Sequence, residues 1–162
     1  MKEKYYTMKP IKLPKFLLCL LLLFSVNAFC QTNNSYDSVL AKKLGADEYG
    51  MKNYIFVILK SGTNNIADKA ILDSLFRGHL ANIHRLAEHG DLVLAGPFGK
   101  NDNNYRGLFI FNAKNIEEVK KFLETDPTIK AKVLEAEIYP WYGSAAVQEI
   151  TEIHNKIAKT SF

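Results

Sequence analysis

The chain has 162 residues and is 48% hydrophobic, enough apolar material for the core of one domain, which argues against an intrinsically disordered protein. Its formal net charge is +4, but residues 1–30 carry five lysines and one glutamate. Residues 31–162 therefore hold 16 basic and 16 acidic side chains and are formally neutral. This balance leaves no basic surface of the kind that binds nucleic acid, so no nucleic-acid partner is expected.

Residues 1–30 have the pattern of a secretory signal peptide. An uncharged stretch, FLLCLLLLFSV, follows the lysines, and it is about half as long as the roughly 20 apolar residues of a membrane-spanning helix. Small residues at Ala28 and Cys30 favour cleavage after Cys30. The protein is therefore predicted to be periplasmic or secreted, with no transmembrane span in the mature chain. A lipoprotein anchored at Cys30 is the alternative, which the bulky Phe29 disfavours.

The first part of the mature chain begins with a polar N-terminal extension at 31–51. Residues 53–60 (NYIFVILK) are rich in β-branched and aromatic side chains and predict a buried central strand. Apolar residues then recur at spacings of three and four, which predicts a helix of about 20 residues ending at Gly90. Residues 91–95 (DLVLA) predict the second strand.

The second strand is predicted to end in a tight turn at Gly96-Pro97, whose free backbone groups could line a pocket. A polar loop leads from this turn to a third, antiparallel strand at 105–112 (YRGLFIFN). Asn115 with Glu118 forms a capping pattern that predicts the start of a second helix.

The second helix must end before Pro127, and Asp126 can cap a further short turn. Residues 134–138 (LEAEI) alternate strictly and predict a fourth strand, which ends at Pro140. The remainder, 143–162, is predicted to be a helical tail with an apolar face.

The order β-α-β-β-α-β predicts a ferredoxin-like α+β fold, in which two helices cover one face of a four-stranded antiparallel sheet. The other face would be apolar, and either of the two alternating sets of side chains of the central strand could lie on it. The candidates are Tyr54, Phe56 and Ile58, or Ile55, Val57 and Leu59, with Phe109 and Phe111. Monomers rarely expose such a patch, so a homodimer through the sheet is expected unless the C-terminal helix covers part of it.

His79 falls in the middle of the apolar stripe of the first helix, so its ring is predicted to point inward. A core histidine with one backbone carbonyl as partner is the plainer interpretation. Asp126, before Pro127, is an ordinary helix cap. If the second helix lies beside the first, however, this carboxylate could also reach His79 and hold the imidazole tautomer for proton transfer.

A metal centre is not expected. His84 and His89 lie five and ten residues beyond His79, and steps of five residues rotate the rings to different helix faces. Both cysteines, Cys19 and Cys30, belong to the predicted leader, so the mature chain would hold none. Aromatic residues near strand ends, Tyr105 and Trp141 among them, are pocket candidates, although such residues more often serve packing.

The chain resembles the YCII-related (YciI-like) family over about 90 residues, and residues 52–142 are predicted to form that domain. The resemblance rests on a combination in a fixed order: His79-Leu80-Ala81, Leu86, Gly90, Leu92, Ala95-Gly96-Pro97, Gly107, Asp126-Pro127 and Pro140-Trp141. It implies a ferredoxin-like, usually dimeric, protein resembling dimeric α/β-barrel proteins, with a pocket around a histidine–aspartate dyad, here His79 and Asp126. The family often has an arginine three residues before the histidine, where this chain has Phe76. Arg77, one place later, is a further pocket candidate that departs from the family's pattern.

Three hypotheses follow from these residues and the resemblance. The first is a cofactor-independent lyase or isomerase acting on a small organic molecule, with His79 as general base in a closed pocket and Asp126 orienting it. The second is a non-catalytic module of the cell envelope that binds a small ligand or a partner. The third takes the sheet pairing as that of a dimeric α/β-barrel monooxygenase or haem protein.

Overall fold

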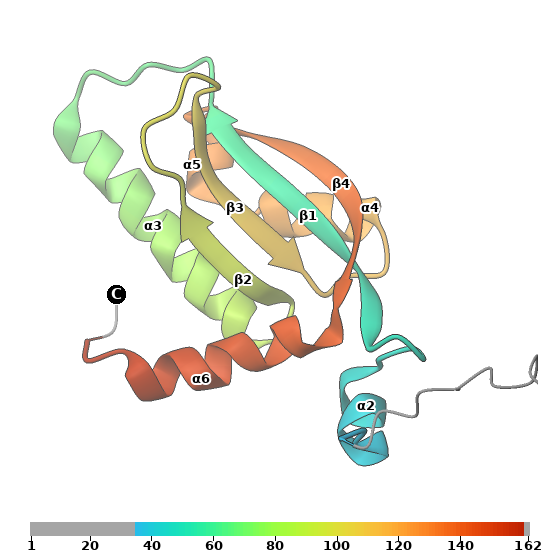
Figure 1. Cartoon of the computed structure of the whole chain (residues 1–162). Coiled ribbons are helices and arrows are strands. Elements are labelled where there is room, and N and C mark those ends of the chain that lie inside the picture. Colours follow the sequence, from blue (N-terminus) through green and yellow to red (C-terminus); the bar gives the residue numbers. More distant parts are fainter. Residues whose placement is uncertain (1–34, 161–162) are drawn as a thin grey trace, which may run out of the picture. The chain divides into compact units, whose positions relative to one another are not determined.

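The computed structural model describes residues 35–160, and from Asp37 onward they form one compact unit. Its central elements are β1 (Met51–Ser61), α3 (Lys69–Glu88), β2 (Leu92–Pro97), β3 (Tyr105–Phe111), α4 (Ile116–Leu123), α5 (Pro127–Lys130) and β4 (Leu134–Ser144). The four strands form one antiparallel sheet in the order β2-β3-β1-β4 (Figure 1). The predicted ferredoxin-like α+β fold is confirmed.

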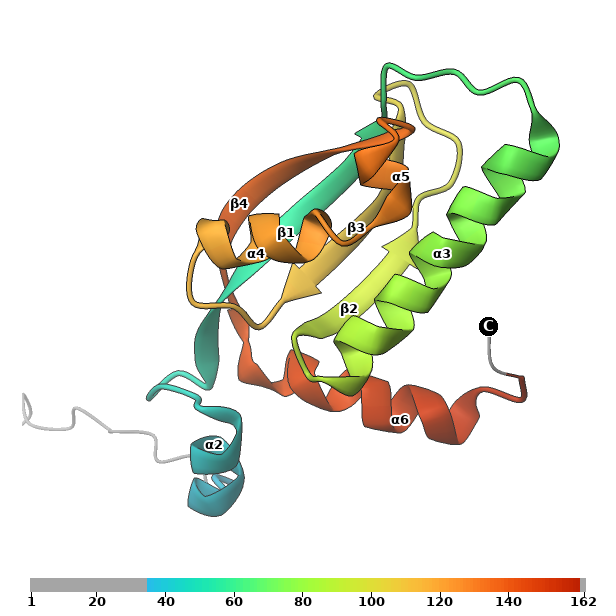
Figure 2. The same ribbon diagram turned by 180° about the vertical axis from the view of Figure 1, so that it is seen from behind.

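The helices α3, α4 and α5 cover one face of this sheet, as the view from behind shows (Figure 2). Side chains of β1 and β3 that point to the helices form the centre of the main core, with Ile55, Val57, Leu59, Phe109 and Phe111 all buried. β1 pairs with β3 on one side and with β4 on the other. Its helix-facing side chains are buried, whereas Phe56 and Ile58 on the opposite face are only half-buried, although the strand is apolar on both faces.

The opposite face of the sheet carries a second apolar cluster of Tyr54, Val93 and Ile110. Phe56, Leu94, Leu108 and Trp141 pack against it while half-exposed. The expectation that Phe109 and Phe111 join this open face is wrong, because their register opposite Val57 and Ile55 turns both rings toward the helices. On β1, the side chains of the open face are therefore those that alternate with the core residues, Tyr54 and Phe56 among them.

Two predicted strand ends also require correction. β2 continues through Gly96 and Pro97, which stand opposite Leu108 and Gly107, so this pair forms no turn. β4 continues past Pro140, which stands opposite Ile55. Both prolines lie in edge strands, where the missing N–H need not break a hydrogen bond of the sheet.

The N-terminal extension contains α2 (Ser38–Leu44), capped by the side chain of Asp37 and ended by Gly45. Gly45 has φ +66°, a left-handed conformation that glycine adopts without a steric penalty. The helix lies against the 3-10 helix η1 (Ala145–Glu149), since Gln148 Nε2 donates to the Leu44 carbonyl at 2.7 Å. The extension is thereby attached to the end of β4.

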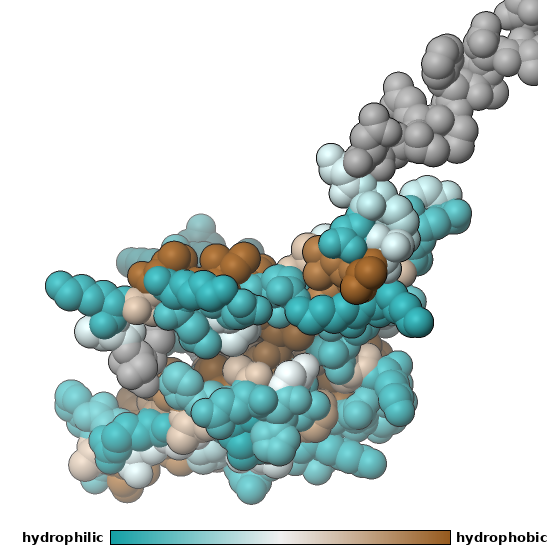
Figure 3. Space-filling model, turned by 90° about the horizontal axis from the view of Figure 1, so that it is seen from below, coloured by the Kyte–Doolittle hydropathy of each residue, from teal (hydrophilic) through white to brown (hydrophobic). Residues whose placement is uncertain are grey.

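η1 is followed by the last described helix, α6 (Ile150–Ile157). None of the side chains of α6 is buried. η1 covers one end of the open sheet face through Ala145 and Val147. Ile153 and Ile157 of α6 are 56% and 75% exposed. In the view from below, apolar side chains interrupt an otherwise hydrophilic surface (Figure 3). Within residues 35–160, no helix is long and apolar enough to cross a membrane.

Asp47 fixes the turn between α2 and β1, and it yields a testable prediction. Its carboxylate accepts hydrogen bonds from Met51 N at 2.9 Å and from the hydroxyl of Tyr142. The bond to Asp47 raises the pKa of Tyr142 from 10.0 to about 12, because ionising the phenol would place two negative charges side by side. In Asp47→Asn the Tyr142 ring is expected to titrate near 10.0 in an NMR pH series, with Asp102→Asn as the unchanged control. An unchanged Tyr142 titration in Asp47→Asn would contradict this.

Candidate active site

The helix α3 positions the histidine. Asp68 caps its start by accepting hydrogen bonds from Ala70 N at 2.8 Å and Ile71 N at 3.2 Å, and the helix ends at Glu88, two residues before Gly90. Its apolar stripe rests on the sheet. His79 lies within this stripe and is 8% exposed, so the predicted inward orientation is observed.

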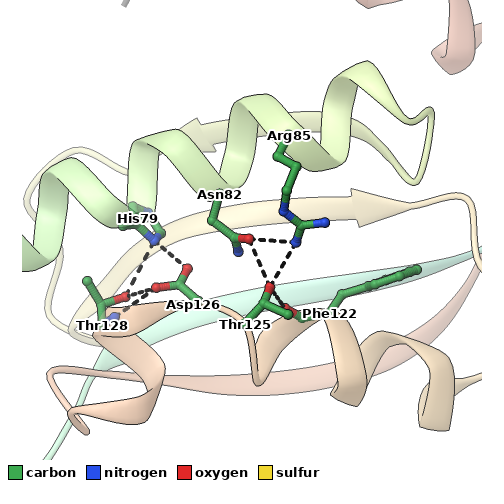
Figure 4. A network of polar contacts seen from close by, with 7 residues as sticks. All are labelled: His79, Asn82, Arg85, Phe122, Thr125, Asp126 and Thr128. Carbon is green, nitrogen blue, oxygen red and sulfur yellow. Dashed lines mark hydrogen bonds and ion pairs between the residues drawn. The ribbon is translucent and has the colours of Figure 1, made fainter.

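The partner of the buried imidazole is a carboxylate. Nδ1 of His79 lies 2.6 Å from Oδ2 of Asp126, which is 1% exposed (Figure 4). Asp126 also caps α5, since its Oδ1 accepts from Thr128 N at 2.8 Å. Asp126 is therefore both a helix cap and the partner of His79. Nδ1 contacts this carboxylate and not a backbone carbonyl, which was the alternative expected for a core histidine.

Thr128 completes the surroundings of the carboxylate. Its hydroxyl donates to Asp126 Oδ1 at 2.6 Å and lies 3.4 Å from His79 Nδ1, and the residue is fully buried. Burial acts to raise the pKa of Asp126, but the hydrogen bonds from His79 and Thr128 outweigh it and lower this pKa below 3.8. Asp126 is therefore an anion at neutral pH.

The imidazole ring lies between two phenylalanines. It is stacked on Phe109 at 6.0 Å between centroids and stands edge-on to Phe76 at 5.9 Å. All its hydrogen bonds to residues 35–160 involve Nδ1. Because the ionised carboxylate accepts the Nδ1 proton, the neutral ring carries its lone pair on Nε2.

A glycine brings the two halves of the site together. Gly78 precedes His79 on α3, and a Cβ built there would lie 2.7 Å from Cγ of Pro127, which is closer than real contacts allow. The close approach of α3 to α5 therefore requires glycine at 78. The same approach brings Asp126 to His79.

The five pocket candidates are distributed over α3, β2, β3 and β4. Arg77 and Pro97 are exposed, Gly96 is half-buried in β2, and Tyr105 packs on Phe98 with 5.9 Å between ring centroids. Within residues 35–160, the hydrogen-bond and ring partners of His79 are Phe76, Phe109, Asp126 and Thr128, and none of the five candidates is among them.

Trp141 lies on the open face of the sheet, opposite to the face that α3 covers. Its ring packs on Tyr54 and Phe56 of the open face, with centroids 5.7 and 6.5 Å away. It stands opposite Tyr54 in register, so the alternation of β4 turns it away from the helices. Its indole covers Gly143, where a Cβ would come within 2.1 Å of the ring.

Two hollows of the single chain have volumes of about 580 and 640 Å³. The first lies between the N-terminal extension and the sheet, with Lys52, Asn53, Asn112 and Lys114 in its wall. The second lies beside α4 and β4 and includes Lys120 and Glu135. Neither borders His79. A closed pocket around the imidazole is therefore not provided by these hollows of one chain.

The histidines and acidic side chains of the described chain are not clustered. Across residues 35–160, no group of three or more His, Cys, Asp or Glu is arranged to hold a metal ion. His84 and His89 lie on the exposed side of α3, away from the buried His79.

Comparison with known families adds to this geometry. A family model described as YCII-related domain matches residues 55–142, more than half of the chain. The chain belongs to the YCII-related family. The match includes both His79 and Asp126 and ends before the C-terminal helices. α2 and α6 therefore lie outside the part that the YCII-related model describes.

One similar solved structure is 5-chloro-2-hydroxyhydroquinone dehydrochlorinase from Burkholderia phenoliruptrix AC1100, in complex with 2,5-dihydroxybenzoquinone. The identity is 23%, the match covers 54% of this chain and 92% of that one, and the TM-score is 0.39. No curated protein matches the chain.

Sequence reasoning missed Thr128 and Gly78. Thr128 stands two residues after a predicted cap, which is where a capping aspartate accepts a backbone N–H. Gly78 is a lone glycine within a long helix, which usually marks a close packing contact. Both signals were in the chain, directly beside the predicted pair.

Proposed function

We propose that the protein is a cofactor-independent enzyme that moves a proton on a small organic molecule, with His79 as general base and Asp126 as the group that orients it. The observation that carries this proposal is the buried contact of 2.6 Å between His79 Nδ1 and Asp126 Oδ2. Membership of the YCII-related family, whose model includes both residues, supports it.

The chemistry follows from the tautomer. Because the Nδ1–H group donates a hydrogen bond to Asp126 and keeps its proton, the free Nε2 can take a proton from an acidic C–H or O–H of the substrate. The electron pair left on the substrate forms a new double bond while a leaving group departs with its own bonding pair, or the proton returns to another atom. The first outcome is an elimination and the second an isomerisation. Asp126 stabilises the imidazolium formed in either reaction.

The phenylalanines beside His79 favour an unsaturated or cyclic substrate. Phe76 and Phe109 both contact the imidazole ring, so its immediate surroundings are apolar and aromatic. Lactones and chlorinated hydroxyquinones are the compounds with which we would begin.

The activity test is a survey of these compounds with the wild type and site variants. His79→Gln is expected to lower turnover by about 10²–10⁴-fold, the usual contribution of a general base. His89→Gln, which changes the exposed histidine at the C-terminal cap of α3, is the control and should keep wild-type rates. Wild-type rates in both His79→Gln and Asp126→Asn on every compound that reacts would refute the proposal.

A second candidate function is a non-catalytic module that binds a small ligand. The hollow of about 580 Å³ beside Lys52 and Lys114 favours it, because this hollow does not include the dyad. In that case His79→Leu would leave ligand affinity unchanged, as measured by calorimetry with the compounds of the survey, and Lys114→Ala would weaken it.

We also propose a homodimer formed through the open sheet face. Half-exposed Phe56, Leu108 and Trp141 lie next to one another on this face, a larger apolar surface than monomers usually leave uncovered. In sedimentation experiments the wild type is expected to sediment as a dimer and Phe56→Lys as a folded monomer. Ile71→Lys, at an exposed site on α3, should remain dimeric. A wild type that is monomeric at all concentrations would contradict this.

We propose that residues 1–30 direct export, with cleavage after Cys30. They lie outside the described residues, and the proposal rests on their charge and hydropathy pattern alone. Mass spectrometry of the protein recovered from a secreting host is expected to find Gln31 as its first residue. A lipid-modified Cys30 at the N-terminus would indicate the lipoprotein instead.

A further inference from the structure

The four residues Thr125 to Thr128, which lead from the end of α4 into the first turn of α5, contact α3 at successive points. Asp126 contacts His79, and Pro127 packs directly against Gly78. Thr125, one residue before the buried carboxylate, contacts Asn82 and Arg85, which lie about one and two helical turns beyond His79 on α3 (Figure 4).

The contacts of Thr125 form a closed network. Nη2 of Arg85 donates to Thr125 Oγ1 at 3.0 Å and to Asn82 Oδ1 at 2.8 Å. The Thr125 hydroxyl lies 2.8 Å from Asn82 Oδ1 and 2.6 Å from the Phe122 carbonyl oxygen, which are both acceptors for its single proton. The network therefore joins α3 to the end of α4.

These three polar residues are not needed to satisfy buried groups. Thr125 and Arg85 are exposed and Asn82 is half-buried, so water would replace the network at little cost in stability. Their position is what distinguishes them, because consecutive Cα atoms are only about 3.8 Å apart and a shift of Thr125 displaces Asp126. A contact of 2.6 Å between Asp126 and His79 changes greatly with a small displacement.

We infer that Thr125, Asn82 and Arg85 form a clamp that sets the separation of Asp126 and His79, and that they are positioning residues for the reaction. The inference rests on the proposed function, because the separation matters for turnover only if His79 is the base. The geometric part is independent of it, since the clamp is expected to hold the pair at its short distance whether or not the protein turns over a substrate.

The test substitutes the hydroxyl without changing the shape of the side chain. Thr125→Val removes the hydroxyl and its contacts with Asn82, Arg85 and Phe122, whereas Thr125→Ser keeps them. Thr63→Val is the matched control at an exposed threonine outside the network. In Thr125→Val the NMR signal of the His79 Nδ1 proton is expected to move upfield, since a longer hydrogen bond deshields the proton less. Thr125→Ser and Thr63→Val should give the wild-type signal.

Kinetics on a compound that reacts supply the second readout. Thr125→Val is expected to lower kcat severalfold with KM unchanged, since a general base held off its position slows the chemical step, and Thr125→Ser should restore it. A wild-type Nδ1 signal in Thr125→Val would overturn the clamp, whatever the kinetics. If no compound reacts but the signal moves in Thr125→Val alone, the clamp stands and the proposed function fails.

Discussion

Asp126→Ala is expected to lower the free energy of unfolding by about 3–5 kcal/mol, the cost typical of removing one member of a buried polar pair. Three groups would lose their acceptor at once: His79 Nδ1, Thr128 N and the Thr128 hydroxyl. All belong to buried residues that water does not readily reach. Denaturant unfolding of the two proteins at pH 7 measures the difference. Asp102→Ala, at an exposed aspartate of the loop after β2, is the control and should match the wild type within about 0.5 kcal/mol.

The same carboxylate gives the wild type a defined pH dependence. Because the folded-state pKa of Asp126 is lowered, its contribution to stability is complete above the ordinary value of 3.8 and is lost as the pH falls through the lowered value. The stability difference between wild type and Asp126→Ala should therefore be constant at higher pH and shrink in that acid range. If Asp126→Ala lost no more stability at pH 7 than the control Asp102→Ala, the Asp126 carboxylate would contribute little to the free energy of unfolding.

Gly78→Ala is expected to destabilise the protein by about 1–3 kcal/mol, which is the usual cost of overpacking. In an unconstrained helix the substitution would stabilise, since alanine is favoured over glycine by roughly 1 kcal/mol. Here the new Cβ would meet Pro127 Cγ at 2.7 Å. α3 and α5 must then separate, which lengthens the contact of His79 with Asp126. Thermal unfolding and the turnover assay should therefore both register the change.

A double variant separates packing from helix propensity. Pro127→Ala removes the ring that a Cβ at position 78 would meet. In a Pro127→Ala background, Gly78→Ala should therefore cost much less stability than it does in the wild type. Ser74→Ala, at an exposed site of the same helix, controls for propensity and should be neutral or slightly stabilising. Stabilisation by Gly78→Ala alone would show that α5 yields to the extra methyl group without cost.

The order of the elements could be predicted because each one carries a strong local signal. β1 is apolar from Tyr54 to Leu59, and α3 has three- and four-residue spacing with Asp68 before it and Gly90 after it. These patterns depend on a few neighbouring residues. The edge strands were harder, because Pro97 and Pro140 end a strand in most settings but continue one at an edge, and the position of a strand within the sheet is not local information.

The assignment of the sheet faces could not be decided from the sequence. Tyr54, Phe56 and Ile58 are as apolar as Ile55, Val57 and Leu59, so the pattern of β1 fits helices on either side. The register of β3 decides it, with Phe109 opposite Val57. That register is a long-range property.

The candidate site was predictable as a pair of residues but not as an assembly. His79 and Asp126 lie 47 positions apart, and the family resemblance linked them before any geometry was available. Thr128 and Gly78 follow from how α5 meets α3 in three dimensions. The face that Trp141 occupies could not be predicted, because a position near a strand end does not tell which side of the sheet a ring lies on.

The measurement that tests the central claim most directly is the ¹⁵N chemical shifts of the His79 ring in the mature protein, at a pH where the imidazole is neutral. The account predicts a protonated Nδ1 and an unprotonated Nε2 in the wild type, because Asp126 accepts the Nδ1 proton. In Asp126→Asn the proton should redistribute toward Nε2. A wild-type ring protonated on Nε2, with shifts that Asp126→Asn leaves unchanged, would contradict the dyad and make His79 a packed core residue.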